Sequence, residues 1–404
     1  MQRREFMASV AATAALTLAS QARAAGGSLR GVTDTEIRIG QTNPYSGPAS
    51  VYAAWYGKVH LAYCDYINSK GGINGRKIKL ISYDDGYQPP RTIEQVRRLI
   101  ERDNVAAIFM IFGTAGNESV KSYVNSKKVP MLFAGTSAEG FADPEKFPYS
   151  MPFSASAGIE ATIYGKYIRQ SMPGKKICIL YQQDDIGVSV RNGLRRGLGE
   201  EASKLIVNEQ AYQVSDTTVD SQVLAMRASG AEIFYNSATL KHAVQAMKKA
   251  GEIGWNPSTF ILNTTTPMAK LLADSGSKMT DTVISTAYLK SPIDPAWAND
   301  PAMVEWKAFM AKFYPDGDAN EPSCVLSTAF LQAMLYVLQT CGNDLTAENI
   351  MRVATNMKDV EIPLLLPGIK LNTSSTDYLP IEELQLIRYD GGRWVNVGGI
   401  VSSK

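Results

Sequence analysis

Histidine and cysteine are scarce in this chain, and their scarcity removes several kinds of catalytic and metal site. The 404 residues include two histidines and four cysteines. His60 and His242 stand alone within predicted helices, and no Cys-x-x-Cys, HExxH, Walker A or GxSxG motif is present. The sequence therefore predicts no catalytic residue, no metal site and no cofactor.

An excess of charge of either sign is also missing. The 41 lysines and arginines nearly balance the 39 aspartates and glutamates, which gives a formal net charge of +2. The basic residues are spread along the chain, whereas a nucleic-acid-binding surface needs a basic face. We therefore expect no nucleic-acid partner.

Long hydrophobic runs are missing as well. The apolar run 10–19 is shorter than the about 20 residues of a bilayer span. It follows the adjacent pair Arg3 and Arg4 and precedes Ala22-Arg23-Ala24, a pattern that predicts a twin-arginine signal peptide over residues 1–24. A disordered or amphipathic N-terminus is the alternative. No later apolar run approaches the length of a span, so we expect a soluble mature protein in the periplasm, without a membrane span.

The four cysteines permit disulfides in an exported protein, but their positions argue against them. Cys324 and Cys341 fall near opposite ends of one predicted helix, about 25 Å apart at the usual rise per residue. Cys64 and Cys178 fall in different predicted lobes. We expect four buried thiols.

Apolar strands alternate with helices over residues 37–138 and again over residues 156–287, which predicts two doubly wound α/β halves with a cleft between them. The continuous apolar run Val105–Phe112 predicts a strand that is covered on both faces. Small polar loops follow three strands of the first half, at residues 42–48, 112–117 and 134–138. Such loops gather at one sheet edge, where the free N–H groups of helix starts suit a carboxylate.

Several motifs then occur in order, and together they resemble a known family. They are Ser46-Gly47-Pro48 followed by Tyr52, Gly71-Gly72-Ile73-Asn74-Gly75-Arg76, Tyr83-Asp84-Asp85, Val129-Pro130-Met131 and Thr136-Ser137-Ala138. The chain resembles the leucine/isoleucine/valine-binding family of periplasmic substrate-binding proteins of ABC importers. The resemblance implies a type I periplasmic-binding fold, an α/β architecture of two Rossmann-like lobes with a central ligand cleft and three crossover hinge strands. We expect lobe 1 over residues 29–155 and 288–361, and lobe 2 over residues 156–287 and 362–404.

The resemblance also implies the ligand-binding residues of lobe 1. Thr114 matches a hydroxyl that holds the ligand carboxylate, and Gly135, Thr136 and Ser137 match the loop that completes this site. Tyr52 matches an aromatic residue beside the ligand's side chain. These hydroxyls also suit helix caps without any ligand, and that alternative stays open.

Lobe 2 departs from the pattern of an amino-acid binder. The glutamate expected to pair with the ligand's ammonium is replaced at Asn263 and Thr264, where no acid is present. Tyrosines expected in the same cleft are replaced by Ile186 and Ala238. Because an unpaired buried ammonium is strongly unfavourable, the sequence favours an aromatic acid, another small acid or an amide over a standard α-amino acid.

Three acidic or nucleophilic patterns have simpler interpretations. Asp184 or Asp185 could replace the missing glutamate, but both also suit the cap of the following helix. Asp84 and Asp85 fit a turn at a strand end better than an acid–base pair. Ser275-Gly276-Ser277-Lys278 fits the S-x-x-K pattern but lacks its partner motifs.

Three functions follow from these observations. The favoured one is a monomeric receptor that captures a small-molecule ligand and docks on the permease subunits of an ABC importer, with branched-chain amino acids as the alternative ligand. A sensory binding protein of the same fold is a second hypothesis. An exported α/β enzyme is the third, and it lacks the nucleophile–base set or glycine fingerprint that it would need.

Overall fold

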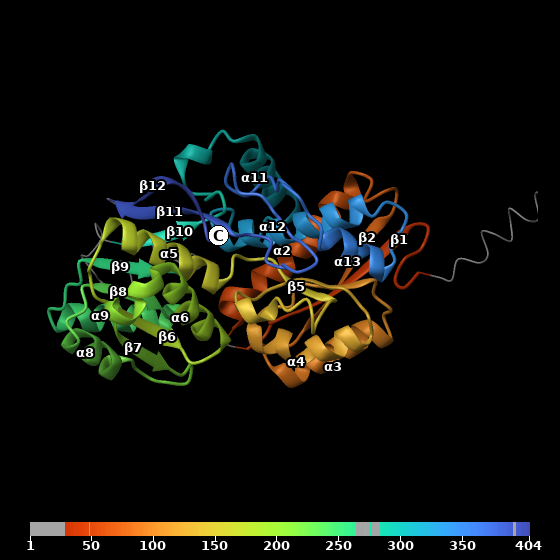
Figure 1. Ribbon diagram of the computed structural model, residues 1–404. Coiled ribbons are helices and arrows are strands. Elements are labelled where there is room, and N and C mark those ends of the chain that lie inside the picture. Colours follow the sequence, from red (N-terminus) through yellow and green to blue (C-terminus); the bar gives the residue numbers. More distant parts are fainter. Residues whose placement is uncertain (1–28, 48, 264–270, 272–274, 276–282, 391–392) are drawn as a thin grey trace, which may run out of the picture.

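Two parallel-stranded lobes lie side by side in the computed structural model (Figure 1). The structure describes residues 29–47, 49–263, 271, 275, 283–390 and 393–404, and only the backbone of Val51 and Tyr52. The predicted signal peptide, residues 1–24, lies outside the described residues. The two-lobed α/β fold predicted from the sequence is confirmed.

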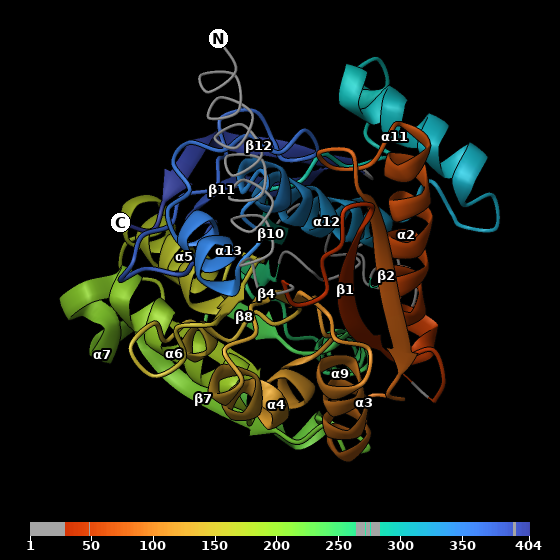
Figure 2. The ribbon, with the colours of Figure 1, turned by 90° about the vertical axis from the view of Figure 1, so that its right-hand side faces the viewer.

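The sheet of lobe 1 has the strand order β2-β1-β3-β4-β5, and its paired strands are parallel. Its strands are β1 (Glu36–Asn43), β2 (Lys77–Asp84), β3 (Ala107–Phe109), β4 (Met131–Ala134) and β5 (Ser150–Pro152). Figure 2 shows α2 (Ser50–Ser69) lying along β1 and β2. α3 (Pro89–Glu101) and α4 (Thr114–Ser126) cover the other face. Ala107 and Phe109 of β3 belong to the apolar cluster that includes α2, whereas Ile108, which points to the opposite face, belongs to the cluster that includes α3 and α4.

Lobe 1 also receives the helices α11 (Pro301–Phe313), α12 (Pro322–Thr340) and α13 (Ala347–Ala354). Among the described residues, α12 is long and apolar enough to span a membrane, with a mean hydropathy of 1.3 over its most apolar window. The expectation that no later run approaches the length of a span is therefore wrong. α12 packs against α2 and β4, and 67% of that window is buried, as expected for a core helix.

The sheet of lobe 2 has the strand order β12-β11-β10-β9-β8-β6-β7, in which β11 pairs antiparallel with both β10 and β12. Its strands are β6 (Ile177–Gln182), β7 (Ile206–Tyr212), β8 (Ile233–Ser237), β9 (Thr259–Leu262), β10 (Val283–Ala287), β11 (Glu383–Asp390) and β12 (Arg393–Ser402). Its helices are α5 (Ala157–Ser171), α6 (Asp185–Leu198), α7 (Ala202–Leu205), α8 (Asp220–Ala228) and α9 (Leu240–Glu252). α5 and α6 pack tightly together, while α8 and α9 cover the opposite face of the sheet.

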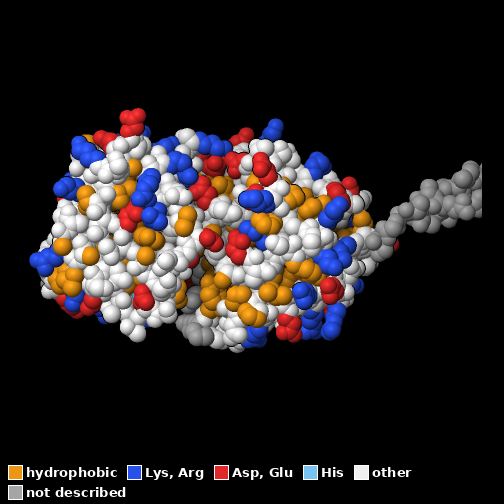
Figure 3. Space-filling model, turned by 60° about the horizontal axis from the view of Figure 1, so that its bottom comes forward, with side chains coloured by type: hydrophobic (Ala, Val, Ile, Leu, Met, Phe, Trp, Pro, Cys, Tyr) orange, Lys and Arg blue, Asp and Glu red, His pale blue; other side chains and the backbone are white. Residues whose placement is uncertain are grey.

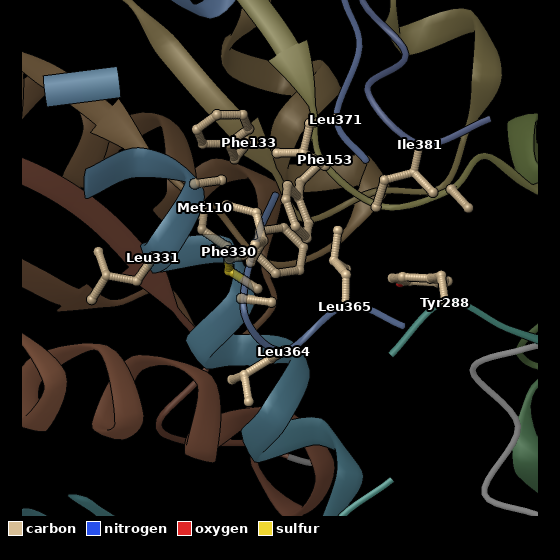
Figure 4. Close-up of a cluster of buried hydrophobic side chains, with 14 of the residues drawn as sticks. Met110, Phe133, Phe153, Tyr288, Phe330, Leu331, Leu364, Leu365, Leu371 and Ile381 are labelled. Carbon is tan, nitrogen blue, oxygen red and sulfur yellow. The ribbon is translucent and has the colours of Figure 1, made fainter. Parts of the chain in front are cut away.

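Within the described chain, the backbone passes between the two sheets three times, after β5, after β10 and before β11. Side chains from all three crossings meet in one apolar cluster, which Figure 4 shows around Phe330 of α12. Phe153, from the first crossing, packs against Phe330 with ring centroids 4.6 Å apart. Tyr288 comes from the second crossing and Leu365 from the third. The exact lobe boundaries given above remain a proposal.

One local prediction differs in extent from the structure, and the strand β5 was not predicted. β3 is shorter than the apolar run Val105–Phe112, because Met110 has a φ of 36° and turns the chain out of the extended conformation. β5 has three residues, too few for a recognisable sequence pattern. The four cysteines are free and buried, as predicted.

Candidate functional site

Thr114, Gly135 and Thr136 are brought together where β3 and β4 end. The hydroxyls of Thr114 and Thr136 lie 2.8 Å apart and share a hydrogen bond, and the Ala138 N–H donates to Thr136 Oγ1 (3.1 Å). The Gly135 N–H donates to the Ile111 carbonyl (3.0 Å), so this amide is already used within the sheet edge. A Cβ on Gly135 would lie 2.8 Å from the Ile111 carbonyl oxygen, which explains the glycine.

Ser137 is the most available donor of this loop. Among the described residues, none hydrogen-bonds to its hydroxyl or to its amide N–H. Its carbonyl accepts the Ala157 N–H (2.8 Å), which ties the loop to the start of α5. Thr114 lies in the first turn of α4, whose N-cap residue Gly113 offers no side chain. The positive end of the α4 dipole therefore points to the same place.

Three neighbouring aromatic side chains at these loops, Tyr56, Phe112 and Tyr87, were not predicted as a group from the sequence. Tyr56 of α2 lies 5.1 Å from Phe112, and Tyr87 lies 6.1 Å from Phe112, measured between ring centroids. Gly113 has a φ of 96°, and a Cβ there would lie 2.3 Å from the Tyr87 ring. The available signal was the position of Tyr87 and Phe112 directly after strand ends, where an open sheet binds ligands.

Asp84 and Asp85 hold turns, as their position in the sequence predicts. Asp84 Oδ1 accepts the Tyr45, Ser46 and Gly86 N–H groups at 2.9–3.1 Å. Asp85 Oδ2 accepts the buried Thr42 hydroxyl (2.7 Å). Burial alone would raise the pKa of Asp84, but the hydrogen bonds from Ser46 and Gly86 outweigh it and lower the pKa.

Asp84→Asn is expected to lower the free energy of unfolding by about 1–3 kcal/mol, since the Nδ2 that replaces Oδ2 cannot accept from the Ser46 hydroxyl or from Arg91 Nη2. Urea denaturation at pH 7 measures this change. Because the folded-state pKa is depressed, the wild type should lose the same stability as pH falls below the unfolded carboxyl's pKa of 3.8, and the variant should not. Equal urea midpoints for the variant and the wild type at pH 7 would contradict the structural role.

Two of the predicted ligand-binding side chains, those of Tyr52 and Thr264, lie outside the described part of the structure. Tyr52 lies in the first turn of α2, and its side chain is outside the described part of the structure. Thr264 also lies outside the described residues. Their predicted roles stay predictions.

Ile186 lies in the first turn of α6 and is partly buried against the core. Asp184 is the N-cap of this helix and accepts the Gly187 N–H (3.0 Å), which confirms its capping position. Burial raises the pKa of Asp184 despite this hydrogen bond. Asp185, next to it, is exposed.

Ala238 is buried in the short segment that follows β8. The next residue, Thr239, is held by two side chains of lobe 2. Its N–H donates to the Tyr212 hydroxyl (2.8 Å), and its Oγ1 lies 3.0 Å from His242 Nδ1. His242 Nε2 lies 2.9 Å from the Asp216 carbonyl oxygen, so this histidine fixes loops.

Asn263, which was expected to replace the glutamate of an amino-acid binder, is engaged within lobe 2. Its amide donates to Ser237 Oγ (2.9 Å), and its carbonyl oxygen accepts the Tyr235 hydroxyl (3.0 Å). The side chain therefore ties the ends of β8 and β9 together.

Glu160 is the acid that sequence reasoning missed near this place. It is 6% exposed on α5, and its Oε1 accepts the hydroxyls of Tyr164 (2.8 Å) and Thr286 (2.9 Å). The Tyr164 hydroxyl also lies 2.7 Å from the Leu262 carbonyl oxygen, so Glu160 lies at the ends of β9 and β10. A single acid inside the apolar stretch of α5 was the available signal.

The surface carries charges of both signs. On the face shown in Figure 3, basic and acidic side chains are interspersed over both lobes. Within the described ranges, no group of three or more histidine, cysteine, aspartate or glutamate residues is arranged to hold a metal ion.

A family model described as "Periplasmic binding protein" matches residues 36–393 of this chain. An "Amino acid binding protein" of Pseudomonas aeruginosa is 22% identical over 311 residues, which span 76% of this chain and 79% of that protein. "Leu/Ile/Val-binding protein homolog 7" of Brucella abortus is 27% identical over 56% of this chain and 58% of its own length.

Solved structures show the same fold. A branched-chain amino acid ABC transporter protein from Thermus thermophilus with bound valine aligns with a TM-score of 0.78 at 15% identity, over 92% of this chain and 97% of that one. A fatty acid ABC transporter substrate-binding protein from Thermomonospora curvata aligns with a TM-score of 0.73 at 20% identity, over 92% of this chain and 94% of that one.

Proposed function

Because this chain belongs to the periplasmic binding protein family, within its branched-chain amino acid transporter branch, we propose that it captures a small carboxylate ligand between its lobes and delivers it to an ABC importer permease. Proteins of this family bind substrates and are not enzymes. The twin-arginine signal predicted for residues 1–24 would supply the export route.

The observation that carries this proposal is the pair of hydroxyls at Thr114 and Thr136 beside Ser137. Thr136 is 4% exposed and accepts from Ala138, whereas Thr114 is half-buried. If Thr136 donates its proton to Thr114, the Thr114 proton is left to donate to a ligand. Thr114 and Ser137 would then hold a carboxylate at the start of α4, with Gly135 and Thr136 positioning them.

The ligand proposed is a carboxylate without an ammonium group, such as an aromatic or other small acid, or a related amide. Asn263 is neutral and its amide is bonded to Tyr235 and Ser237. Glu160 already accepts two hydroxyls. An ammonium beside Asn263 would find no opposite charge on that residue, which disfavours it. Ile186 and Ala238, together with Tyr52 and Thr264, would complete the cleft as the lobes close.

A thermal-shift screen of the mature protein, from Ala25 onward, tests this ligand class. Leucine, valine, phenylalanine, benzoate, hydroxybenzoates, short dicarboxylates and urea form the panel. A ligand that binds only the folded state raises the melting temperature by mass action. A shift confined to compounds without an ammonium group supports the proposal, and a shift with leucine or valine contradicts it.

Thr114→Ala and Ser137→Ala are each expected to weaken binding of the best compound about tenfold or more, because each removes a hydrogen bond to a charged group. Isothermal titration calorimetry measures the change. Ser126→Ala is the matched control, since its hydroxyl bonds the Tyr123 carbonyl in the last turn of α4. Unchanged affinity in Ser137→Ala would show that the carboxylate binds elsewhere.

A sensory role is the alternative outcome for the same site. Uptake of the identified ligand by cells with and without this gene distinguishes the two roles. Loss of uptake supports delivery to a permease, and unchanged uptake supports sensing.

A further inference from the structure

The 3-10 turn η1 (Glu139–Phe141), which we call the strap, directly follows the loop Gly135–Ala138 and contacts both lobes. Phe141 is fully buried in an apolar cluster of lobe 1 that also contains Val120 and Met131. The Lys121 ammonium lies 4.8 Å from the centroid of the Phe141 ring. One end of the strap is therefore fixed in lobe 1.

The other end of the strap, Glu139, contacts lobe 2. Its carboxylate lies 3.1 Å from Arg196 Nη2, and its N–H donates to Ser189 Oγ (3.0 Å). Both partners are held in place by lobe 2 itself. Arg196 Nε donates to Thr162 Oγ1 on α5 (3.1 Å), and Ser189 Oγ donates to the Asp185 carbonyl (2.8 Å).

The contact between Glu139 and lobe 2 is close, and it is bordered by a cavity. A Cβ on Gly158 would lie 1.6 Å from Glu139 Oε2, so the carboxylate rests directly on the backbone of α5. A cavity of about 410 Å³ lies between α4, the strap and α6. Its lining includes Glu118, Lys121, Asp185 and Asn192. Open space thus borders the strap where it meets lobe 2.

We propose that Glu139 is a positioning residue, which ties the loop Gly135–Ala138 to α6 so that movement of lobe 2 moves Ser137. This inference rests on the proposed function, since it treats this loop as the ligand-binding loop. The loop is held from lobe 2 on two sides, by Glu139 and by the Ser137 carbonyl, which accepts from Ala157. Ligand capture and lobe closure would then be coupled through one short segment.

The test measures the relative position of the lobes and the protection of the loop. A stability measurement would not separate the proposed role of Glu139 from that of an ordinary ion pair. The side chains of Glu139 and Arg196 are 28% and 48% exposed, so their pair adds little to global stability. Arg196→Glu opposes Glu139 with a like charge, and Glu139→Arg combined with Arg196→Glu restores the attraction. Arg195→Glu is the matched control, because Arg195 pairs with Glu209 inside lobe 2 (2.6 Å).

Two measurements on the ligand-free full mature chain report the effect. Spin labels attached at Glu94→Cys on α3 and Lys248→Cys on α9, both exposed positions, give the distribution of distances between the lobes. The four native cysteines are buried, which favours selective labelling. Hydrogen exchange of peptides covering residues 135–141 reports the loop itself.

Arg196→Glu is expected to broaden the interlobe distances and to speed exchange of the loop about fivefold, and the charge-swapped double variant is expected to reverse both changes. Arg195→Glu should leave both unchanged. The proposal is overturned if Arg196→Glu matches wild type, if the swap gives no recovery, or if Arg195→Glu has the same effect. Because no ligand is present, failure of the ligand screen leaves this result intact.

Discussion

Gly193→Ala is expected to destabilise the protein by about 3 kcal/mol, because α5 and α6 touch at this residue. A Cβ at Gly193 would lie 2.1 Å from the Gly158 carbonyl oxygen, and one at Gly197 would lie 2.1 Å from the Thr162 carbonyl oxygen. These atoms belong to helix backbone, so a side-chain rotation cannot relieve the overlap. The two helices would have to separate along their contact.

Differential scanning calorimetry measures this effect, as a lowering of the melting temperature by roughly 4 °C. Gly251→Ala in α9 is the matched control. A Cβ there meets nothing within 4 Å, so alanine should be neutral or stabilise the helix by about 0.5–1 kcal/mol. Equal melting temperatures for the two variants would show that the α5–α6 contact tolerates a methyl group.

Acid is expected to destabilise the fold through His60, which is fully buried between β1 and α12. Its Nδ1 lies 2.9 Å from the Gln41 side chain, and its Nε2 lies 3.0 Å from the Ser327 carbonyl oxygen. Burial lowers the pKa of His60 from 6.5 to about 3, and the bond to Ser327 offsets this only in part.

The direction of this pH effect follows from the number of protons that His60 binds in the folded and the unfolded state. Above pH 6.5 both the folded and the unfolded states hold a neutral ring, so stability does not change through His60. As pH falls from 6.5 towards 3, only the unfolded state takes up the proton, and the free energy of unfolding falls. The loss at pH 5 should be roughly 2 kcal/mol relative to pH 7.5.

Urea denaturation between pH 5 and 7.5 measures this slope in the wild type and in His60→Gln, whose amide can still hydrogen-bond. The variant is expected to be less stable at pH 7.5. Its free energy of unfolding should also fall less steeply with decreasing pH, because unfolding takes up about one proton fewer. NMR titration of the folded protein provides a direct check. A His60 imidazole that titrates near pH 6 in the folded state would refute the argument.

Local sequence patterns determined the succession of strands and helices and the turn roles of Asp84 and Asp85. They also determined the burial of the cysteines. Hydrophobic periodicity, capping residues and turn residues act over a few positions, so a single chain displays them directly. The same logic placed Thr114 and Ser137 at one sheet edge, because parallel strands share the direction of their ends.

Only the tertiary structure decided which side chains far apart in the sequence meet. Glu160 contacts Thr286, which is 126 positions away, and Glu139 contacts Arg196, which is 57 positions away. The engagement of Asn263 by Tyr235 and Ser237 likewise depends on how β8 and β9 end side by side. Such contacts follow from the packing of whole elements and from the order of strands in a sheet, which local periodicity does not specify.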